Sequence, residues 1–201
     1  MHPIRVIAIH GGDAFATYKD YLAYLTSATV DLTDGQRQGW RQRLQMLLGD
    51  AYAVTLPRMP NANNAKYVEW KLWFEKYIPL LPDDVILVGH SQGASFLAKY
   101  LAEERFPKKI HATFLIAPPY DTDGDRAVVE FVPPASLALL AEQGGEVFLY
   151  HSTDDFVVPF SEHGKYVEQL PSAHARVFAD RGHFLQEDFP ELIKDINGLR
   201  V

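Results

Sequence analysis

The stretch Gly89-His90-Ser91-Gln92-Gly93 decides how this chain folds, because of what stands on either side of it. The apolar run Val85-Ile86-Leu87-Val88 precedes it, which is typical of a buried strand in a parallel sheet. Apolar residues at helical spacing follow it, namely Ala94, Leu97, Ala98 and Leu101. A Gly-x-Ser-x-Gly pattern between a strand and a helix indicates a sharp turn that exposes the serine oxygen at the end of the strand.

The two glycines of this turn have a steric role. A backbone that turns so sharply is strained, and Cβ atoms at positions 89 and 93 would collide with the adjoining strand and helix. The turn also places the serine at the amino end of a helix, where backbone N–H groups can receive negative charge. We therefore predict that Ser91 is a nucleophile.

A nucleophilic serine needs a base and an acid that orients the base. The chain has candidates for both after two later apolar runs. Asp154 and Asp155 follow the run 146–150, and His183 follows the run 175–179. The carboxyl ends of parallel strands meet at one edge of a sheet, so we expect these side chains to face the same crevice as Ser91.

The choice between the two aspartates stays open. Asp155 is favoured, because it begins the spacing Asp-x-x-Val-Pro that ends at Pro159. Asp154 is the alternative. Whichever aspartate is not the acid is expected to cap nearby N–H groups in the turn.

A hydrolytic serine also needs two N–H donors for the oxyanion. One predicted donor is Gln92, the residue after the nucleophile. The other should come from the loop His10-Gly11-Gly12-Asp13, which follows the first predicted strand. We place it at Gly12, with Gly11 and Asp13 as close alternatives. His10 and His90 are expected to be packed or hydrogen-bonded wall residues.

These motifs resemble those of α/β-hydrolases. More narrowly, the chain resembles the small serine-hydrolase family that includes the retinoblastoma-binding hydrolase and its bacterial relatives. The segment Met59-Pro60-Asn61 leading to Glu69-Trp70 carries this narrower resemblance. It implies a compact hydrolase with little or no lid. The Leu-x-Cys-x-Glu motif that binds retinoblastoma protein cannot occur in a chain with no cysteine, so that interaction is not carried over.

Alternating strand and helix patterns predict one α/β domain over residues 1–201, a three-layer α/β/α sandwich around a mostly parallel sheet. Six strands are expected near 4–9, 51–56, 84–88, 110–116, 146–150 and 175–179. By analogy with the family, their order would be 2-1-3-4-5-6. Three helices are expected to turn apolar faces to the core, and these faces hold Trp40, Leu44, Leu47 and Leu48; Trp70, Trp73, Phe74 and Tyr77; and Leu192, Ile193, Ile196 and Leu199.

Two longer segments could shape a substrate pocket. Residues 14–32 are rich in Tyr, Phe and Leu and predict a short helix, either as an apolar pocket wall beside Ser91 or as part of the core. Residues 118–145 contain the acidic loop 121–125. Its glycine position does not fit a calcium loop, so we expect a solvated turn.

Composition narrows the partners. The chain of 201 residues has a net charge of −7 and no basic cluster, which argues against nucleic acid and anionic membranes. No apolar run approaches the ~20 residues that span a bilayer. Met1-His2-Pro3 run straight into a predicted strand, so we expect no signal peptide and a cytoplasmic location. The histidines show no ligand spacing, so no metal and no cofactor are predicted. Oligomeric state is not predicted.

The sequence therefore favours a serine hydrolase with the residues Ser91, His183 and Asp155, which cleaves a small ester-like substrate through an acyl-enzyme. Amide, thioester and peptide substrates stay open. The alternative from another class is a binding or scaffolding protein that keeps the fold without catalysis. The intact set of three residues disfavours it.

Overall fold

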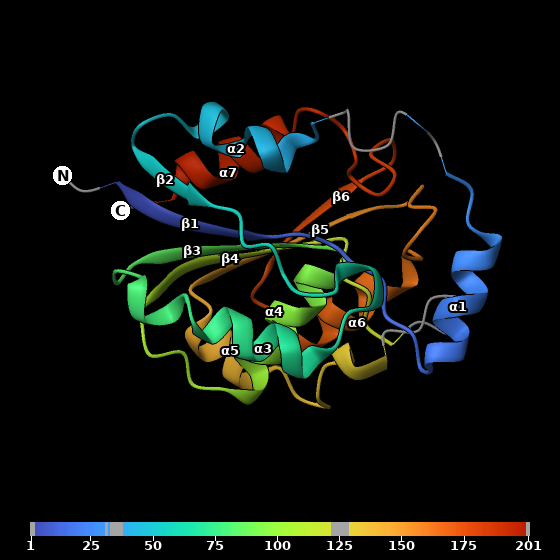
Figure 1. Cartoon of the computed structure of the whole chain (residues 1–201). Coiled ribbons are helices and arrows are strands. Elements are labelled where there is room, and N and C mark those ends of the chain that lie inside the picture. The colour runs from blue at the N-terminus through green and yellow to red at the C-terminus, as the bar shows by residue number, and fades with distance from the viewer. Residues whose placement is uncertain (1–2, 31, 33–37, 122–128, 200–201) are drawn as a thin grey trace.

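Six parallel strands form one open sheet at the centre of the molecule (Figure 1). The computed structural model describes residues 3–30, 32, 38–121 and 129–199. The strands are β1 (Ile4–Ile9), β2 (Tyr52–Thr55), β3 (Val85–His90), β4 (Ile110–Ile116), β5 (Glu146–Ser152) and β6 (His174–Phe178). Their order is β2-β1-β3-β4-β5-β6, and every neighbouring pair is parallel. The predicted strands and their order are confirmed.

Helices cover both faces of this sheet and make the three predicted layers. On one face lie α2 (Trp40–Leu48) and α7 (Pro190–Gly198). On the other lie α3 (Tyr67–Glu75), α4 (Gln92–Glu103), α5 (Ala138–Gln143) and α6 (Ser161–Gln169). Short 3₁₀ turns are found at Ala62–Asn64, Ile78–Leu80 and Val129–Phe131. Within the described residues, no helix is both long enough and apolar enough to span a bilayer.

The core consists of two apolar clusters, one on each face of the sheet. Alternate residues of a strand point to opposite faces, so Ile7 and Ile9 join one cluster and Val6 and Ala8 the other. Because both faces are buried, the central strands are mostly apolar rather than alternating. This explains why β3 reads as an unbroken apolar run before the turn at Ser91.

The predicted helix faces are mostly confirmed. Trp73 was predicted in the core and is 45% exposed. At 100° per residue, Trp70 and Phe74 lie 40° apart and form the buried stripe, whereas Trp73 lies beyond its edge. Leu47, Tyr77 and Ile193 are half-buried at the edges of their stripes. The buried members are Trp40, Leu44, Leu48, Trp70, Phe74, Leu192, Ile196 and Leu199.

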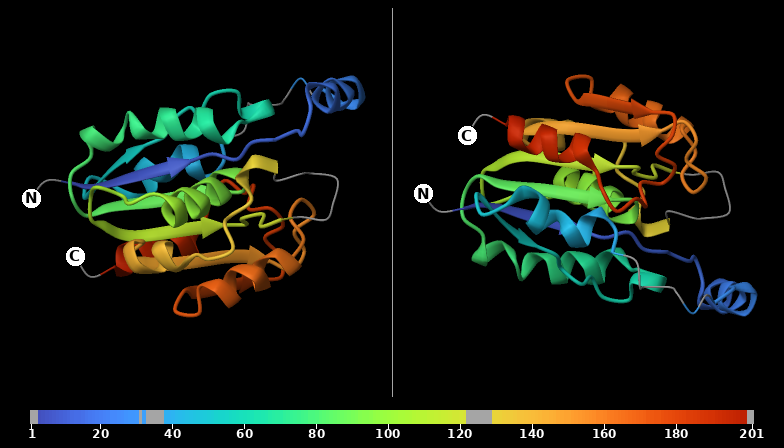
Figure 2. Two further views of the ribbon diagram at one scale, coloured as in Figure 1. Left: turned by 90° about the horizontal axis from the view of Figure 1, so that it is seen from below. Right: turned by 90° about the horizontal axis from the view of Figure 1, so that it is seen from above.

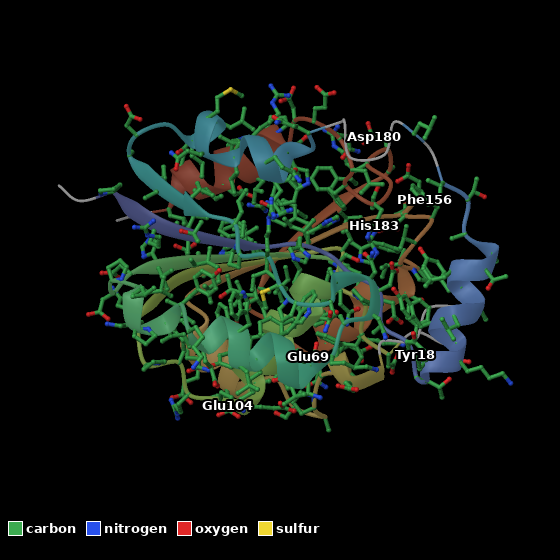
Figure 3. All side chains as sticks on the ribbon, viewed as in Figure 1. Tyr18, Glu69, Glu104, Phe156, Asp180 and His183 are labelled. Carbon is green, nitrogen blue, oxygen red and sulfur yellow. The ribbon has the colours of Figure 1, made fainter. Side chains whose placement is uncertain are left out.

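The helix predicted within residues 14–32 forms, but its predicted placement is wrong. It is α1 (Tyr18–Ser27), which begins with a capping box between Thr17 and Asp20. None of its residues is buried, and both views in Figure 2 show it standing away from the sheet. Tyr18 is 68% exposed, and Figure 3 shows it well below His183. The helix is therefore neither a core element nor a wall of the pocket at Ser91.

The turn between β3 and α4 has the strain expected of it. Ser91 has φ 54° and ψ −124°, a conformation that L-residues rarely adopt. A Cβ atom at Gly93 would lie 2.5 Å from the carbonyl oxygen of His10, and one at Gly89 would lie 2.6 Å from the Cα atom of Ala94. The steric role predicted for both glycines is confirmed.

This contact predicts a stability difference between two glycines. Gly93→Ala should lower the free energy of unfolding by about 1–3 kcal/mol, because its methyl group meets the fixed backbone of β1. Gly164→Ala is the matched control. Position 164 lies inside α6 with no atom within 4 Å of an added Cβ, so alanine should stabilise the protein there by about 0.5–1 kcal/mol. Urea denaturation measures both changes. Equal stability of the two variants would contradict the steric argument.

Candidate active site

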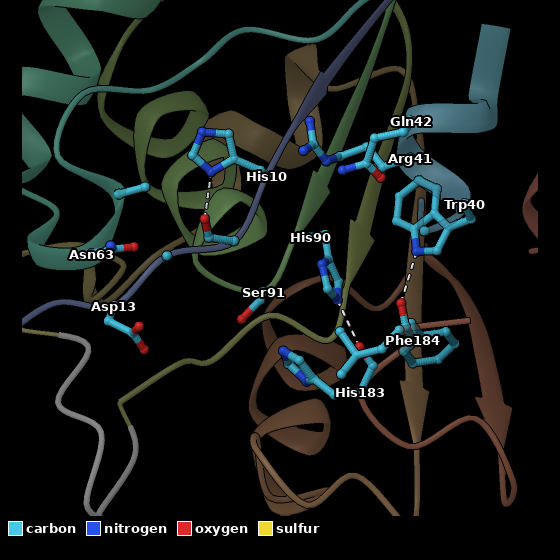
Figure 4. Close-up of a pocket in the computed structure, with 15 residues that line it drawn as sticks. His10, Asp13, Trp40, Arg41, Gln42, Asn63, His90, Ser91, His183 and Phe184 are labelled. Carbon is cyan, nitrogen blue, oxygen red and sulfur yellow. Dashed lines mark hydrogen bonds between the residues drawn. The ribbon is translucent and has the colours of Figure 1, made fainter. Parts of the chain in front are cut away.

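Ser91 lies in a pocket of about 440 Å³ at the carboxyl edge of the sheet (Figure 4). Five stretches of chain meet around it. These are the loop after β1, the start of α2, the 3₁₀ turn Ala62–Asn64, the turn after β3 and the segment after β6. The lining residues nearest to the chemistry discussed below are His10, Gly11, Gly12, Arg41, Ser91 and His183.

Asp155 and His183 form a buried pair beside this pocket. His183 Nδ1 lies 2.8 Å from Asp155 Oδ2 and 3.1 Å from Oδ1. The aspartate side chain is fully buried, and that of His183 is 6% exposed. The backbone N–H groups of Val157 and Val158 also donate to Asp155 Oδ1, at 2.8 and 2.9 Å. The carboxylate is therefore held in one orientation from two sides.

These contacts keep the carboxylate ionised. Burial alone would raise the pKa of Asp155. The hydrogen bond and charge of His183 and the two N–H donors outweigh burial, so the pKa is lowered. The ionised Asp155 accepts a hydrogen bond from Nδ1–H of His183, so in the neutral ring the proton is on Nδ1 and Nε2 has none.

Asp154 has different hydrogen-bond partners from Asp155. Its Oδ1 accepts the N–H of Gly182 at 2.9 Å and the hydroxyl of Ser152 at 2.5 Å. It thereby joins the turn after β5 to the turn that carries His183. Asp155, and not Asp154, contacts the histidine, and Asp154 caps N–H groups in the way expected of a turn residue.

Ser91 and His183 line the same pocket without a direct bond. Among the hydrogen bonds of the described residues, none joins Ser91 Oγ to His183. Hydrogen bonds between a nucleophile and its base are often long in unliganded enzymes and tighten with substrate. The pocket has room for a substrate between and above these two side chains.

His90 supports His183 from behind. Its Nε2–H donates to the carbonyl oxygen of His183 at 2.8 Å, and the two ring centroids lie 4.9 Å apart. Burial lowers the pKa of His90 to about 3, and the charge of His183 acts in the same direction. His90 is thus a neutral, hydrogen-bonded wall residue.

The loop after β1 passes close to the serine. A Cβ atom at Gly11 would lie 3.2 Å from that of Ser91, and one at Gly12 would lie 2.7 Å from the carbonyl oxygen of Ala62. The N–H of Asp13 donates to this same oxygen at 2.8 Å. Asp13 is therefore unsuitable as an oxyanion donor, and that alternative is wrong. Among the described residues, no hydrogen bond uses the N–H groups of Gly11, Gly12 or Gln92.

His10 holds the peptide between Gly11 and Gly12. Its Nε2 accepts the N–H of Met59 at 2.9 Å, so its Nδ1 carries the proton and donates to the carbonyl oxygen of Gly11 at 2.5 Å. In a trans peptide the N–H points opposite to the C=O. The N–H of Gly12 therefore points away from His10, and Figure 4 shows Ser91 on that side of the loop.

Arg41 lines the pocket, although no sequence motif pointed to it. Its side chain reaches from the first turn of α2 toward the loop after β1 (Figure 4). In the sequence, Arg41 lies off the apolar face of its predicted helix. Every solvent-exposed helix residue has that property, so the sequence could not identify Arg41 as a pocket residue.

The described residues hold no group of three or more His, Cys, Asp or Glu side chains that could bind a metal.

Known proteins resemble this chain in sequence. The model of the serine hydrolase family matches residues 31–190. The serine hydrolase RBBP9 of Rattus norvegicus is 26% identical over 166 residues, which cover 80% of this chain and 84% of that protein.

Solved structures share the fold at lower identity. The ydeN gene product of B. subtilis aligns with a TM-score of 0.74 at 19% identity, over 98% of both chains. A carboxylesterase of the thaumarchaeon Nitrososphaera gargenis aligns with a TM-score of 0.62 at 15% identity, over 97% of this chain and 88% of that one. The fold is that of the α/β-hydrolases. Because the family model matches well over half of its length, the chain belongs to the serine hydrolase family.

Proposed function

We propose that this protein hydrolyses a small ester-like substrate through a covalent acyl-enzyme, with Ser91, His183 and Asp155 as its catalytic residues. The observation that carries the proposal is the buried Asp155–His183 pair, set in the same pocket as a serine on a strained turn. A buried carboxylate that fixes a histidine tautomer beside an exposed serine is the arrangement that activates a serine hydroxyl.

Each residue has a role in the first half of the reaction. The oxygen of Ser91 attacks the carbonyl carbon while His183 Nε2 removes its proton. Asp155 keeps the proton of the neutral ring on Nδ1 and stabilises the imidazolium that forms. His183 then returns the proton to the leaving group. In the second half, water activated by the same histidine releases the acid.

The N–H groups of Gly12 and Gln92 bind the oxyanion in this proposal. Gln92 begins α4, so its N–H has no partner within the helix. His10 turns the N–H of Gly12 toward the serine side of its loop. Removal of one such donor typically costs about 10²- to 10³-fold in kcat. The N–H of Gly11 is the remaining alternative for the second donor.

An ester is the preferred substrate. The pocket has a size that suits a small molecule. The carboxylesterase among the structural neighbours also supports an ester, although the same fold carries other hydrolases. An amide or a thioester would use the same steps with a different leaving group.

The first prediction concerns the nucleophile. Ser91→Ala should lower kcat for a p-nitrophenyl ester by at least about 10³-fold, because no other group forms the acyl-enzyme. A fluorophosphonate probe should label the unchanged protein and fail to label this variant. Ser172→Ala, at an exposed turn outside the pocket, is the control and should label normally. Near-normal turnover by folded Ser91→Ala would refute the mechanism. Absence of labelling in the unchanged protein would favour the non-catalytic alternative.

The second prediction separates the adjacent aspartates. Asp155→Asn should lower kcat by about 10³- to 10⁴-fold, since the amide no longer holds His183 in the required tautomer. Asp154→Asn should cost far less, because its amide oxygen still accepts the N–H of Gly182. Kinetics are compared after thermal melts show that both variants are folded. The reverse order of activities would move the acid to Asp154.

A further inference from the structure

Arg41 is a cation in the pocket of Ser91 that has no partner among the residues described by the structure. Among the described residues, its guanidinium makes no hydrogen bond and no ion pair, although it lines the pocket together with Ser91 and His183. Its neighbour Arg43, two residues along α2, lies outside the pocket and pairs with Glu187 and Asp188 at 3.5 and 2.9 Å. On the same short helix, Arg43 therefore has carboxylate partners, whereas Arg41 has none among the described residues.

The surroundings of Arg41 make this unpaired state costly. The residue is half-buried, and burial lowers the pKa of its guanidinium. Arginine nevertheless stays charged at neutral pH, because its ordinary pKa lies so far above it. A partly desolvated cation with no carboxylate or carbonyl partner loses hydration without compensation. An external anion is the group that would restore its hydrogen bonds.

Among the described residues, the neighbouring ionisable groups do not supply a negative charge that pairs with Arg41. Burial lowers the pKa values of His10 and His90, and the charge of Arg41 acts in the same direction on both. Nε2 of His10 accepts the N–H of Met59, so this ring is neutral and offers no negative charge to Arg41. The carboxylate of Asp13 lines the same pocket, but it lies well apart from Arg41 in Figure 4. Arg41 is therefore the positive group that a substrate meets at the α2 side of the pocket.

We propose that Arg41 binds a carboxylate carried by the substrate, so that the enzyme prefers esters with a second, anionic end. This inference rests on the proposed function and names its substrate class. The guanidinium presents parallel N–H donors that match the two oxygens of a carboxylate. A polar but uncharged substrate end would satisfy the donors without compensating the charge.

The test compares anionic esters with neutral esters of nearly the same shape. Monomethyl adipate and the methyl ester of adipamic acid differ in charge on the acyl side. The pair para-acetoxybenzoate and para-acetoxybenzamide differ in charge on the alcohol side. Proton release measures kcat/KM for each ester, and the ratio of anionic to neutral substrate is the readout. We expect a ratio of at least about tenfold in one of the two pairs, the scale of a hydrogen-bonded charge pair.

Three variants test whether Arg41 causes the preference for the anionic ester. Arg41→Gln should bring the ratio close to one, and Arg41→Lys should keep part of it because the charge remains. Arg43→Gln is the matched control and should keep the ratio of the unchanged protein, since Arg43 lies outside the pocket. A ratio near one for the unchanged protein in both pairs would overturn the inference, as would a ratio that survives Arg41→Gln.

Binding separates this inference from the proposed function. The Ser91→Ala variant should bind the preferred anionic ester about tenfold more tightly than its neutral partner by calorimetry. Adding Arg41→Gln should remove that difference. If the unchanged protein neither cleaves any of the four esters nor reacts with a fluorophosphonate, the proposed function fails. The charge preference in binding would still support or overturn the role of Arg41.

Discussion

The close approach of α4 to the end of β1 is the constraint on which the rest of the site depends. The backbone at Gly93 lies so near the carbonyl oxygen of His10 that no side chain fits between them. This approach brings the first turn of α4 beside the loop after β1, so that Ser91 and Gly11 come into contact distance. The strained conformation of Ser91 follows, because the chain must leave β3 and enter a helix that is already pressed against β1.

Hydrogen bonds between turns then position the histidine. His183 is held by Asp155 at its Nδ1 and by His90 at its carbonyl oxygen. Asp154 and Ser152 hold the preceding turn through the N–H groups of Gly182 and Arg181. These partners come from the ends of β3 and β5, so the position of His183 depends on the register of the sheet. A fixed tautomer and a fixed ring position are what a general base requires.

Local sequence patterns predicted most of the fold. They failed where contacts between distant segments determine the placement of a helix or a side chain. The run 85–88 and the glycines around Ser91 have a single steric solution, so strand, turn and helix could all be predicted. The apolar residues of α1 predicted a helix, but helical periodicity does not say which surface a helix will contact, and no residue of α1 is buried. The spacing Asp-x-x-Val-Pro favoured Asp155 over Asp154 without deciding between them. Only the folded turn shows which carboxylate points to His183.

Arg41 is another residue whose surroundings sequence patterns did not predict. Its unfavourable burial connects the stability of the fold with its function. Three unfavourable features lie in or beside this pocket: the strained turn at Ser91, the N–H groups of Gly12 and Gln92, and the cation of Arg41. Among the described residues, these N–H groups have no hydrogen bond and the cation has no ion pair. Folding alone would favour relieving each of them, and elsewhere α2 does so by pairing Arg43. Proteins retain such costs mainly where a ligand or transition state removes them. An attacked ester would relieve the first two features, because its carbonyl carbon meets the exposed serine and its oxyanion meets the N–H groups. Neither step involves the guanidinium of Arg41, and the proposed carboxylate of the substrate is the group that would remove this third cost.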